Sequence, residues 1–226
     1  MKRAVVVGSL GNLGPVWVET LIEMGFDVRC LDPPEFDASN EECVTGNARA
    51  CEVFWGAPDI VIYNAAIDNP PVPGTTFWLN KKRIVEVNLI GAMNVYEAFL
   101  PMMIKNGGGL LINVGSIQGR IGADWRNYPP GIRKPVGYNA SKAALEQLTR
   151  SSCTDYGEKN IRAVTMAFGP YDNGKFDPVF KEKILRNIPI GRLVQKESLK
   201  ATLRYVIECP ELTGQTVLVD GGYTAW

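Results

Sequence analysis

Short, almost continuously apolar runs alternate with longer helix-like segments along the whole chain of 226 residues. Strands that are apolar at nearly every position need cover on both faces, and a parallel sheet receives that cover from helices packed on each side. We therefore predict an α/β, doubly wound Rossmann-like fold, with about seven parallel strands and helices on both faces.

The elements expected from this pattern can be placed along the chain. The predicted strands are residues 3–7, 27–31, 42–44 (the weakest), 59–63, 110–114, 162–166 and 216–219. The predicted helices are residues 15–24, 48–55, 77–105, 136–156, 178–186 and 197–208. Pro101 is expected to kink the long helix or end it early. Gly- and Pro-rich segments at 69–75, 120–135 and 169–178 are predicted loops, and ligands are expected beyond the carboxyl ends of the strands.

No shift in composition divides the chain, so residues 1–226 are interpreted as a single dinucleotide-binding and catalytic domain. Residues 171–192 are predicted to form a lid over the substrate, because specificity commonly lies in such loops.

The chain contains no histidine. This excludes Ser-His-Asp and Cys-His hydrolases and every His-ligated metal centre, so we expect no metal. An enzyme with this composition needs Tyr, Lys, Asp, Glu or Cys as its acid/base group.

Charge and cysteine content restrict the partners. With 24 basic and 24 acidic residues and no basic stripe, the chain is predicted to bind a small molecule rather than nucleic acid. Five scattered cysteines without a CxxC pair suit reduced thiols in the cytoplasm. The short apolar run at the N-terminus breaks too early for a signal peptide, and no membrane partner is expected.

A glycine-rich turn, VGSLGNLG, follows the first predicted strand. Glycines permit a tight turn and let the backbone approach a pyrophosphate at the N-terminus of the next helix. The expected cofactor-binding residues here are Gly8, Gly11, Asn12, Leu13 and Gly14. The alternative is a simple strand-to-helix turn.

Asp32 ends the second predicted strand, 18 residues after Gly14. A carboxylate there accepts hydrogen bonds from ribose hydroxyls and repels a 2′-phosphate, which favours NAD over NADP. Alternatively, Asp32 is a turn residue before Pro33 and Pro34.

Tyr138 and Lys142 lie one helical turn apart in YNASK, on the same face of a predicted helix. A nearby ammonium favours the phenolate, so Lys142 is expected to lower the pKa of Tyr138 and also to hold a ribose hydroxyl. A second pair with this spacing, Tyr171 and Lys175, has the composition of a turn and is interpreted as a chance match.

Further polar residues are expected near this pair. Ser116 directly follows the strand at 110–114 and could hold a substrate oxygen, or simply cap a turn. Asn88 is polar on an apolar stretch and is expected either to hold a water relay to Lys142 or to make ordinary core hydrogen bonds. At the end of another strand, Asn64, Ala65 and Ala66 are small enough to let the chain run close to a cofactor.

Together these segments resemble the short-chain dehydrogenase/reductase family, in its short single-domain branch. The resemblance covers the whole chain and rests on GSLGNLG, Asp32, YNAA, Asn88, INVGSIQG, YNASK and TGQTVLVDGGYTAW. It implies a catalytic tetrad of Asn88, Ser116, Tyr138 and Lys142, an NAD(P) cofactor, and a homodimer or homotetramer.

Some positions depart from the family pattern. Asn12 stands where a second glycine is usual, Asn47 replaces the common adenine-contacting Asp, and Phe168-Gly169 replaces Pro-Gly. Asn47, Ala48 and Gly169 are nevertheless expected at the cofactor.

A long basic and aromatic insertion, GRIGADWRNYPPGIRKP, precedes Tyr138. It makes the chain similar to a sub-branch of flagellin modification protein A and other surface-sugar dehydrogenases. One hypothesis is that Trp125, Arg126, Arg133 or Lys134 helps to bind a sugar or sugar derivative. The alternative is a solvated loop that packs on a neighbour.

The predicted function is therefore reversible, NAD(H)-dependent hydride transfer between the nicotinamide and a secondary alcohol or ketone. Two rivals stay open. A nucleotide-sugar epimerase or dehydratase of the extended branch shares the spacing of Gly8, Gly11 and Gly14. A non-catalytic dinucleotide-binding sensor is the other.

Overall fold

The computed structural model describes residues 1–68, 78, 80–172, 174 and 176–225. Its six strands form one parallel sheet in the order β2-β1-β3-β4-β5-β6. The strands are β1 (Arg3–Val7), β2 (Asp27–Leu31), β3 (Ile60–Tyr63), β4 (Gly109–Val114), β5 (Ile161–Phe168) and β6 (Gln215–Val219). The predicted doubly wound α/β fold is confirmed, with six strands in place of about seven. The predicted loop at 69–75 lies outside the described residues.

The expected weak strand at 42–44 is wrong. These residues belong to α2 (Glu41–Phe54), which also begins well before the helix predicted at 48–55. Asn40 caps this helix by accepting a hydrogen bond from the Cys43 backbone N–H at 2.9 Å, and two glutamates occupy its first turn, where the helix dipole favours negative charge. A three-residue apolar run is too short for its periodicity to separate strand from helix, and the cap decides the outcome here.

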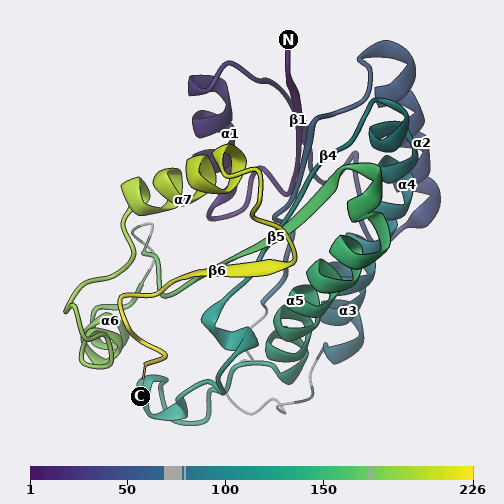
Figure 1. Cartoon of the computed structure of the whole chain (residues 1–226). Helices are drawn as coiled ribbons and strands as arrows, with labels where there is room; N and C mark the ends of the chain where they lie inside the picture. The colour runs from purple at the N-terminus through teal and green to yellow at the C-terminus, as the bar shows by residue number, and fades with distance from the viewer. Residues whose placement is uncertain (69–77, 79, 173, 175, 226) are drawn as a thin grey trace.

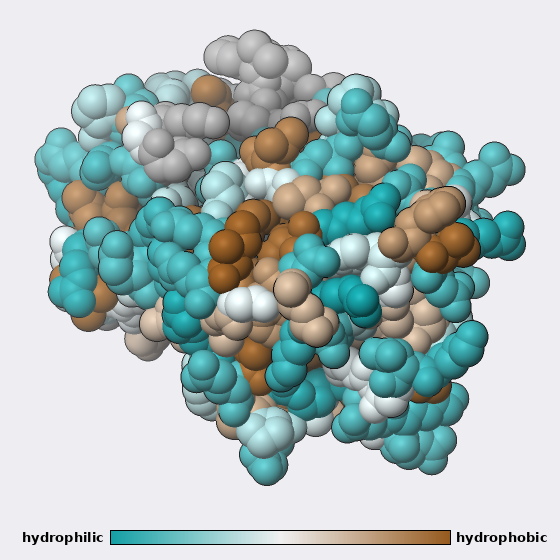
Figure 2. Space-filling model, turned by 90° about the horizontal axis from the view of Figure 1, so that it is seen from above, coloured by the Kyte–Doolittle hydropathy of each residue, from teal (hydrophilic) through white to brown (hydrophobic). Residues whose placement is uncertain are grey.

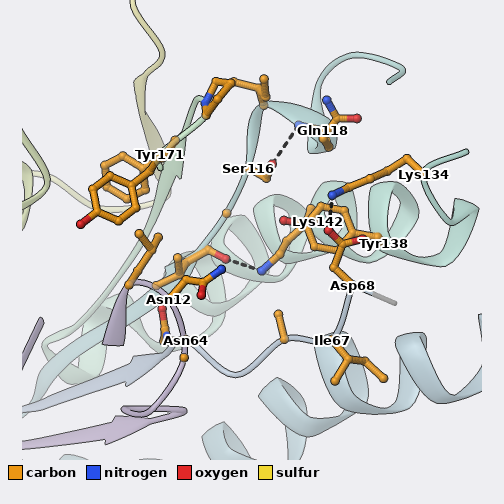
Figure 3. Close-up of a pocket in the computed structure, with 18 of the residues that line it drawn as sticks. Asn12, Asn64, Ile67, Asp68, Ser116, Gln118, Lys134, Tyr138, Lys142 and Tyr171 are labelled. Carbon is orange, nitrogen blue, oxygen red and sulfur yellow. Dashed lines mark hydrogen bonds and ion pairs between the residues drawn. The ribbon is translucent and has the colours of Figure 1, made fainter. Parts of the chain in front are cut away.

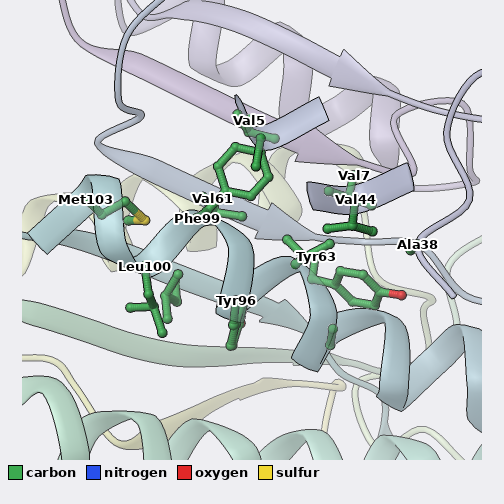
Figure 4. Close-up of a cluster of buried hydrophobic side chains, with 14 of the residues drawn as sticks. Val5, Val7, Ala38, Val44, Val61, Tyr63, Tyr96, Phe99, Leu100 and Met103 are labelled. Carbon is green, nitrogen blue, oxygen red and sulfur yellow. The ribbon is translucent and has the colours of Figure 1, made fainter. Parts of the chain in front are cut away.

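Helices cover both faces of the sheet (Figure 1). Helices α1 (Gly14–Glu23) and α7 (Lys196–Glu208) pack on one face, and α2, α4 (Gly91–Lys105) and α5 (Val136–Tyr156) on the other. Side chains alternate along each strand, so that Val5 and Val7 meet α2 and α4 while Ala4 and Val6 meet α1. Figure 4 shows the core between the sheet and helices α2 and α4. The near-continuous apolar strands are therefore explained by cover on both sides.

The long apolar helix is one continuous rod built from three parts. It runs through α3 (Lys81–Val85), a π-helical turn (Glu86–Ile90) and α4. Pro101 lies inside α4, so of the two expected outcomes, a kink or an early end, the early end is wrong. Within the described residues, this stretch is long and apolar enough to cross a membrane by length and composition. However, 56% of its most apolar part is buried within the protein, as in the core helix of a globular fold.

Most of the remaining short elements lie at the carboxyl ends of the strands. These are two 3₁₀ turns (Ile117–Gly119 and Trp125–Asn127), α6 (Pro178–Leu185) and the C-terminal segment, which lies near α6 (Figure 1). A small apolar cluster joins them through Ile117, Ile184 and Tyr223. A third 3₁₀ turn (Gly157–Lys159) precedes β5. Elsewhere the surface is mostly hydrophilic, with hydrophobic side chains in small separate patches on the face shown in Figure 2.

Candidate active site

A cleft of about 510 Å³ opens at the carboxyl ends of the strands, where ligands were expected. It runs from the glycine turn after β1 to Tyr138 on α5 (Figure 3). The predicted site residues that line it are Gly8, Gly11, Asn12, Leu13, Asp32, Asn64, Ala65, Ala66, Ser116, Tyr138, Lys142 and Gly169. The predicted site residues that do not line it are Gly14, Asn47, Ala48 and Asn88.

The glycine turn is packed too tightly for side chains. Gly8 has a φ of +82°, and a Cβ there would lie 2.6 Å from the Ala65 backbone. A Cβ on Gly14 would lie 2.2 Å from the Ser9 carbonyl oxygen. Gly8 therefore lets the turn pack against the segment after β3, whereas Gly14 lets helix α1 start directly against the turn.

Asn64 holds this turn in place. Its amide nitrogen donates to the Gly8 carbonyl at 2.6 Å, and its amide oxygen accepts a hydrogen bond from the Trp17 indole at 2.9 Å. The Trp17 ring in turn stacks on Phe168, with ring centroids 5.7 Å apart. Asn64 thus ties β3 to both the turn and α1, which is more than the small-residue argument anticipated.

Asp32 lines the far end of the cleft from Tyr138. One carboxylate oxygen accepts the Leu10 backbone N–H at 2.9 Å, and the other accepts the Ser9 hydroxyl. Among the described residues that line the cleft, the cations are Lys134 and Lys142, both near Tyr138. The Asp32 end therefore carries negative charge without a cation beside it.

Asn47 and Ala48 lie within α2 and do not line the cleft, Asn47 half-buried and Ala48 buried. The Asn47 side chain donates to the Cys43 carbonyl one turn earlier in α2 at 3.0 Å, and Ala48 is buried in the core beneath that helix. The structure gives neither residue a place in the cleft. The reason is that α2 begins early, so both positions fall within a packed helix rather than at its exposed start.

Tyr138, Ser116 and Lys142 meet at the other end of the cleft (Figure 3). Ser116 follows β4 and caps the first 3₁₀ turn, accepting the Gln118 N–H at 3.1 Å. The Lys142 ammonium donates to the Val114 carbonyl at 2.7 Å and lies 5.7 Å from the centroid of the Tyr138 ring. The three residue types needed to hold and protonate a substrate oxygen are therefore brought together.

The charge states at this site differ from the sequence-based expectation. Burial raises the pKa of Tyr138 to about 12, the Asp68 carboxylate adds to the rise, and a hydrogen bond with Ser116 opposes it. Burial also lowers the pKa of Lys142 to about 8. The net shift in the Tyr138 pKa is thus opposite to the predicted lowering, because loss of water on burial is its largest cause.

Asn88 is fully buried in the π-helical turn and does not reach the cleft. Its side chain accepts the Ile67 N–H at 2.8 Å and donates to the Ile67 carbonyl and the Ser141 hydroxyl, both at 3.1 Å. Ser141 donates to the Tyr138 carbonyl at 2.8 Å. Asn88 therefore joins the loop after β3 to the start of α5, which matches the core-hydrogen-bond alternative and makes it a positioning residue.

The sequence analysis did not anticipate every cleft residue. Asp68, which follows β3, forms an ion pair inside the cleft with Lys134, one of the four candidate residues of the insertion. The cleft is also lined by the aromatic residues Tyr128, Tyr171, Phe176, Phe180 and Tyr223. Tyr171, Phe176 and Phe180 belong to the predicted lid, whereas Asp68, Tyr128 and Tyr223 lie far apart in sequence and could have been indicated only by their common position after strand ends.

Of the four candidate residues of the insertion, one lines the cleft. Lys134 lines it, whereas the Arg126 guanidinium pairs with Asp124 and the Arg133 guanidinium lies 5.1 Å above the exposed Trp125 ring. Tyr171, the tyrosine of the second Tyr–Lys pair, lies in a non-helical stretch as expected. Lys175 lies outside the described residues.

A family model described as enoyl-(acyl carrier protein) reductase, adh_short_C2, matches residues 18–224. The chain belongs to the short-chain dehydrogenase/reductase family. It is thus an oxidoreductase of that family, with a nicotinamide dinucleotide as cofactor and an alcohol or ketone as substrate.

Curated relatives of this enzyme have different substrates. It is 32% identical to carbonyl reductase family member 4 of Danio rerio, over 62% of this chain and 54% of that protein, so the match spans about half of that relative's length. It is 26% identical to cis-4-hydroxycyclohexanecarboxylate dehydrogenase of Sinomonas cyclohexanicum, over 99% of this chain and 97% of the relative.

Solved structures of similar fold carry either cofactor. A short-chain dehydrogenase from Leptospira borgpetersenii with bound NAD+ has a TM-score of 0.88 and 25% identity, over 99% of this chain and 92% of that one. A gluconate 5-dehydrogenase from Burkholderia cenocepacia, in complex with NADP and tartrate, has a TM-score of 0.83 and 23% identity, over 100% and 96%. At 23% identity, the likeness to the gluconate 5-dehydrogenase shows that the two proteins share a fold.

Proposed function

We propose that this enzyme transfers a hydride reversibly between NAD(H) and a secondary alcohol or ketone. The observation that carries the proposal is one continuous cleft. Its glycine turn and Asp32 suit a dinucleotide, and Ser116, Tyr138 and Lys142 suit a reacting oxygen. The glycine turn, which lines the cleft and leads directly into the N-terminus of α1, is the feature that fits the pyrophosphate.

Each residue has a separate task in this proposal. The bound nicotinamide supplies or accepts the hydride. The Tyr138 hydroxyl gives a proton to the substrate oxygen during reduction and removes it during oxidation. Ser116 donates a hydrogen bond to the same oxygen, which stabilises the negative charge that develops there. Lys142 places an ammonium beside Tyr138, and Asn88 fixes the loop and the helix that frame the site.

The preference for NAD over NADP is part of the proposal. A 2′-phosphate near Asp32 would face a carboxylate, and the cleft cations among the described residues lie at the opposite end. We expect NAD+ to bind at least tenfold more tightly than NADP+. Asp32→Ser should reduce that ratio mainly by improving NADP+ binding, as calorimetry can measure. Equal affinities for the two cofactors in the unaltered protein contradict this assignment.

The proton-transfer role is tested with Tyr138→Phe. This variant should lose most turnover, by a factor of 100 or more, while its NADH affinity stays within about twofold. Tyr205→Phe, on the exposed surface of α7, is the matched control and should keep full activity. Near-normal kcat in Tyr138→Phe would falsify the role.

The same assay separates the two rival functions. Net change in absorbance at 340 nm during turnover indicates a dehydrogenase, whereas an epimerase returns the hydride and shows none. A sensor binds NADH but turns over no member of a broad panel of alcohols and ketones.

The wider setting is also proposed. We infer a single catalytic domain with residues 171–192 as a lid, since Tyr171, Phe176, Phe180 and Ile184 line the cleft.

Neutral net charge and unpaired cysteines support a cytoplasmic protein without nucleic-acid or membrane partners. The family resemblance supports a homodimer or homotetramer, which light scattering tests. The insertion's Lys134 supports a sugar-like substrate in keeping with the surface-sugar sub-branch, and comparing sugar with non-sugar alcohols tests this.

A further inference from the structure

An ion pair lies in the cleft beside the reacting tyrosine and takes no part in the proton transfer described above. The Lys134 ammonium binds an Asp68 carboxylate oxygen and lies 4.4 Å from the centroid of the Tyr138 ring, nearer than Lys142 does. Figure 3 shows both side chains converging next to Tyr138. Both side chains are partly exposed, by 17% for Lys134 and 33% for Asp68, so a ligand in the cleft can reach them.

The pair has unused hydrogen-bonding capacity. The second carboxylate oxygen of Asp68 is buried and has no hydrogen-bond partner in the part of the chain that the structure describes. Because this oxygen is buried, a ligand in the cleft reaches the other carboxylate oxygen, which binds Lys134 and has a second lone pair. An ammonium carries three N–H donors, and Asp68 occupies one of those of Lys134. The exposed part of the pair thus offers an acceptor, the carboxylate oxygen that binds Lys134, next to the remaining N–H donors of Lys134.

A hydroxyl group matches this combination because it donates and accepts at once. A carboxylate or phosphate in the same place would face the Asp68 charge, and an ammonium would face Lys134. The pair as a whole is neutral, so it favours a neutral group that satisfies both partners.

Aromatic rings make up part of the substrate end. The Phe180 ring lies 5.2 Å from the rings of both Tyr128 and Phe176, measured between centroids, and all three line the cleft. The polar side chains of Gln118, Asp124 and Asn127 line it as well. A substrate that fits there has a carbon face that packs on the rings. The Asp68–Lys134 pair is therefore placed to recognise one polar group near the reacting carbon.

We propose that Asp68 and Lys134 bind a hydroxyl group one or two carbons from the carbon that is oxidised or reduced. The substrate class is then a neutral vicinal diol or α-hydroxy ketone with a carbon face that packs on the aromatic rings. This inference rests on the proposed function, because Tyr138 marks the reacting carbon. The hydroxyl donates to the Asp68 oxygen that binds Lys134 and accepts from Lys134.

The first test compares trans-cyclohexane-1,2-diol with cyclohexanol as substrates with NAD+. The unaltered enzyme should prefer the diol at least tenfold in kcat/KM. In Asp68→Ala and Lys134→Met the ratio should fall to within about twofold of one, chiefly through a higher KM for the diol. Lys105→Met, which removes a lysine paired with Glu52 on the outer surface, is the control and should keep the preference. A preference that persists in both cleft variants overturns the proposal.

A second measurement separates this inference from the proposed function. Saturation-transfer NMR on the NADH-bound Tyr138→Phe protein detects diol binding without turnover. The diol signal should exceed that of cyclohexanol and should fall severalfold when Asp68→Ala is added. If neither compound is oxidised, but the diol binds and Asp68→Ala abolishes binding, the pair is supported while the proposed reaction is not. Absence of diol binding, or binding unchanged by Asp68→Ala, contradicts the role of the pair.

Discussion

Lys142 is buried with only 3% of its surface exposed, so its charge state is coupled to folding. Burial lowers its pKa to about 8, below the ordinary value of 10.5. The unfolded chain therefore holds this proton between pH 8 and 10.5, while the folded protein has released it. Stability rises with pH wherever the unfolded state binds more protons.

We predict that the free energy of unfolding contributed by Lys142 increases from pH 8 to about 10.5, with a slope of up to about 1.4 kcal/mol per pH unit. Lys142→Met should remove this increase, since methionine keeps the length of the chain without its charge. Urea unfolding at pH 7, 8, 9 and 10 gives the difference between the two proteins. Lys105→Met on α4 controls for loss of a surface lysine. A constant difference across the range excludes the coupling.

At single residues, local geometry was predictable from the sequence, whereas features that depend on the whole fold were not. The four-residue spacing of Tyr138 and Lys142 correctly put both on one helix face, because that geometry is local. The direction of the Tyr138 pKa shift was not predictable, since it depends on burial produced by the whole fold. The partnership of Asp68 with Lys134 joins residues 66 positions apart, which no local pattern reveals.

Among the elements, the start of α1 depends on the absence of one side chain. A Cβ on Gly14 would lie 2.2 Å from the Ser9 carbonyl oxygen, whereas one on Gly46 in α2 would meet nothing within 4 Å. We predict that Gly14→Ala destabilises the protein by roughly 2 kcal/mol or more and weakens NADH binding, because the turn has to move. Gly46→Ala, the matched control, should stabilise it by about 0.5–1 kcal/mol. Thermal unfolding of the two variants measures these stability changes. Equal stability of Gly14→Ala and Gly46→Ala contradicts the steric argument.

The link between β3 and α1 gives a second prediction for the elements. Asn64→Ala leaves the Trp17 indole and the Gly8 carbonyl without their partner. The expected cost is about 1–3 kcal/mol in urea unfolding, together with a severalfold higher Kd for NADH. Asn106→Ala, on the exposed end of α4, should change neither quantity.

Element boundaries were predictable where a pattern was long. Helix α5 has the predicted bounds, because 21 residues carry enough periodicity and a preceding proline marks the start. The segment 42–44 was misassigned because its helix signal came from the Asn40 cap rather than from periodicity. Pro101 does not end the helix early as one of the two expectations had it, since α4 continues through Pro101 to Lys105.

For the molecule as a whole, the cleft has a dinucleotide end and a substrate end that come from different parts of the chain. Tyr223, near the C-terminus, lines the substrate end, where its hydroxyl accepts a hydrogen bond from Asn127 at 3.3 Å. We predict that Tyr223→Ala raises KM for the alcohol by about fivefold or more and leaves Kd for NADH within twofold. Tyr205→Ala on the surface of α7 is the control. If Tyr223→Ala weakens NADH binding as much as it raises KM for the alcohol, the dinucleotide end and the substrate end do not act independently.

The strand order has a kinetic consequence. Every pairing in the sheet is parallel, so every neighbour is reached only after the chain has crossed over one face. No hairpin can start the sheet locally, and each contact requires the closure of a long loop before it gains anything. Refolding of this chain should accordingly be slow, with partly collapsed species whose open strand edges can associate.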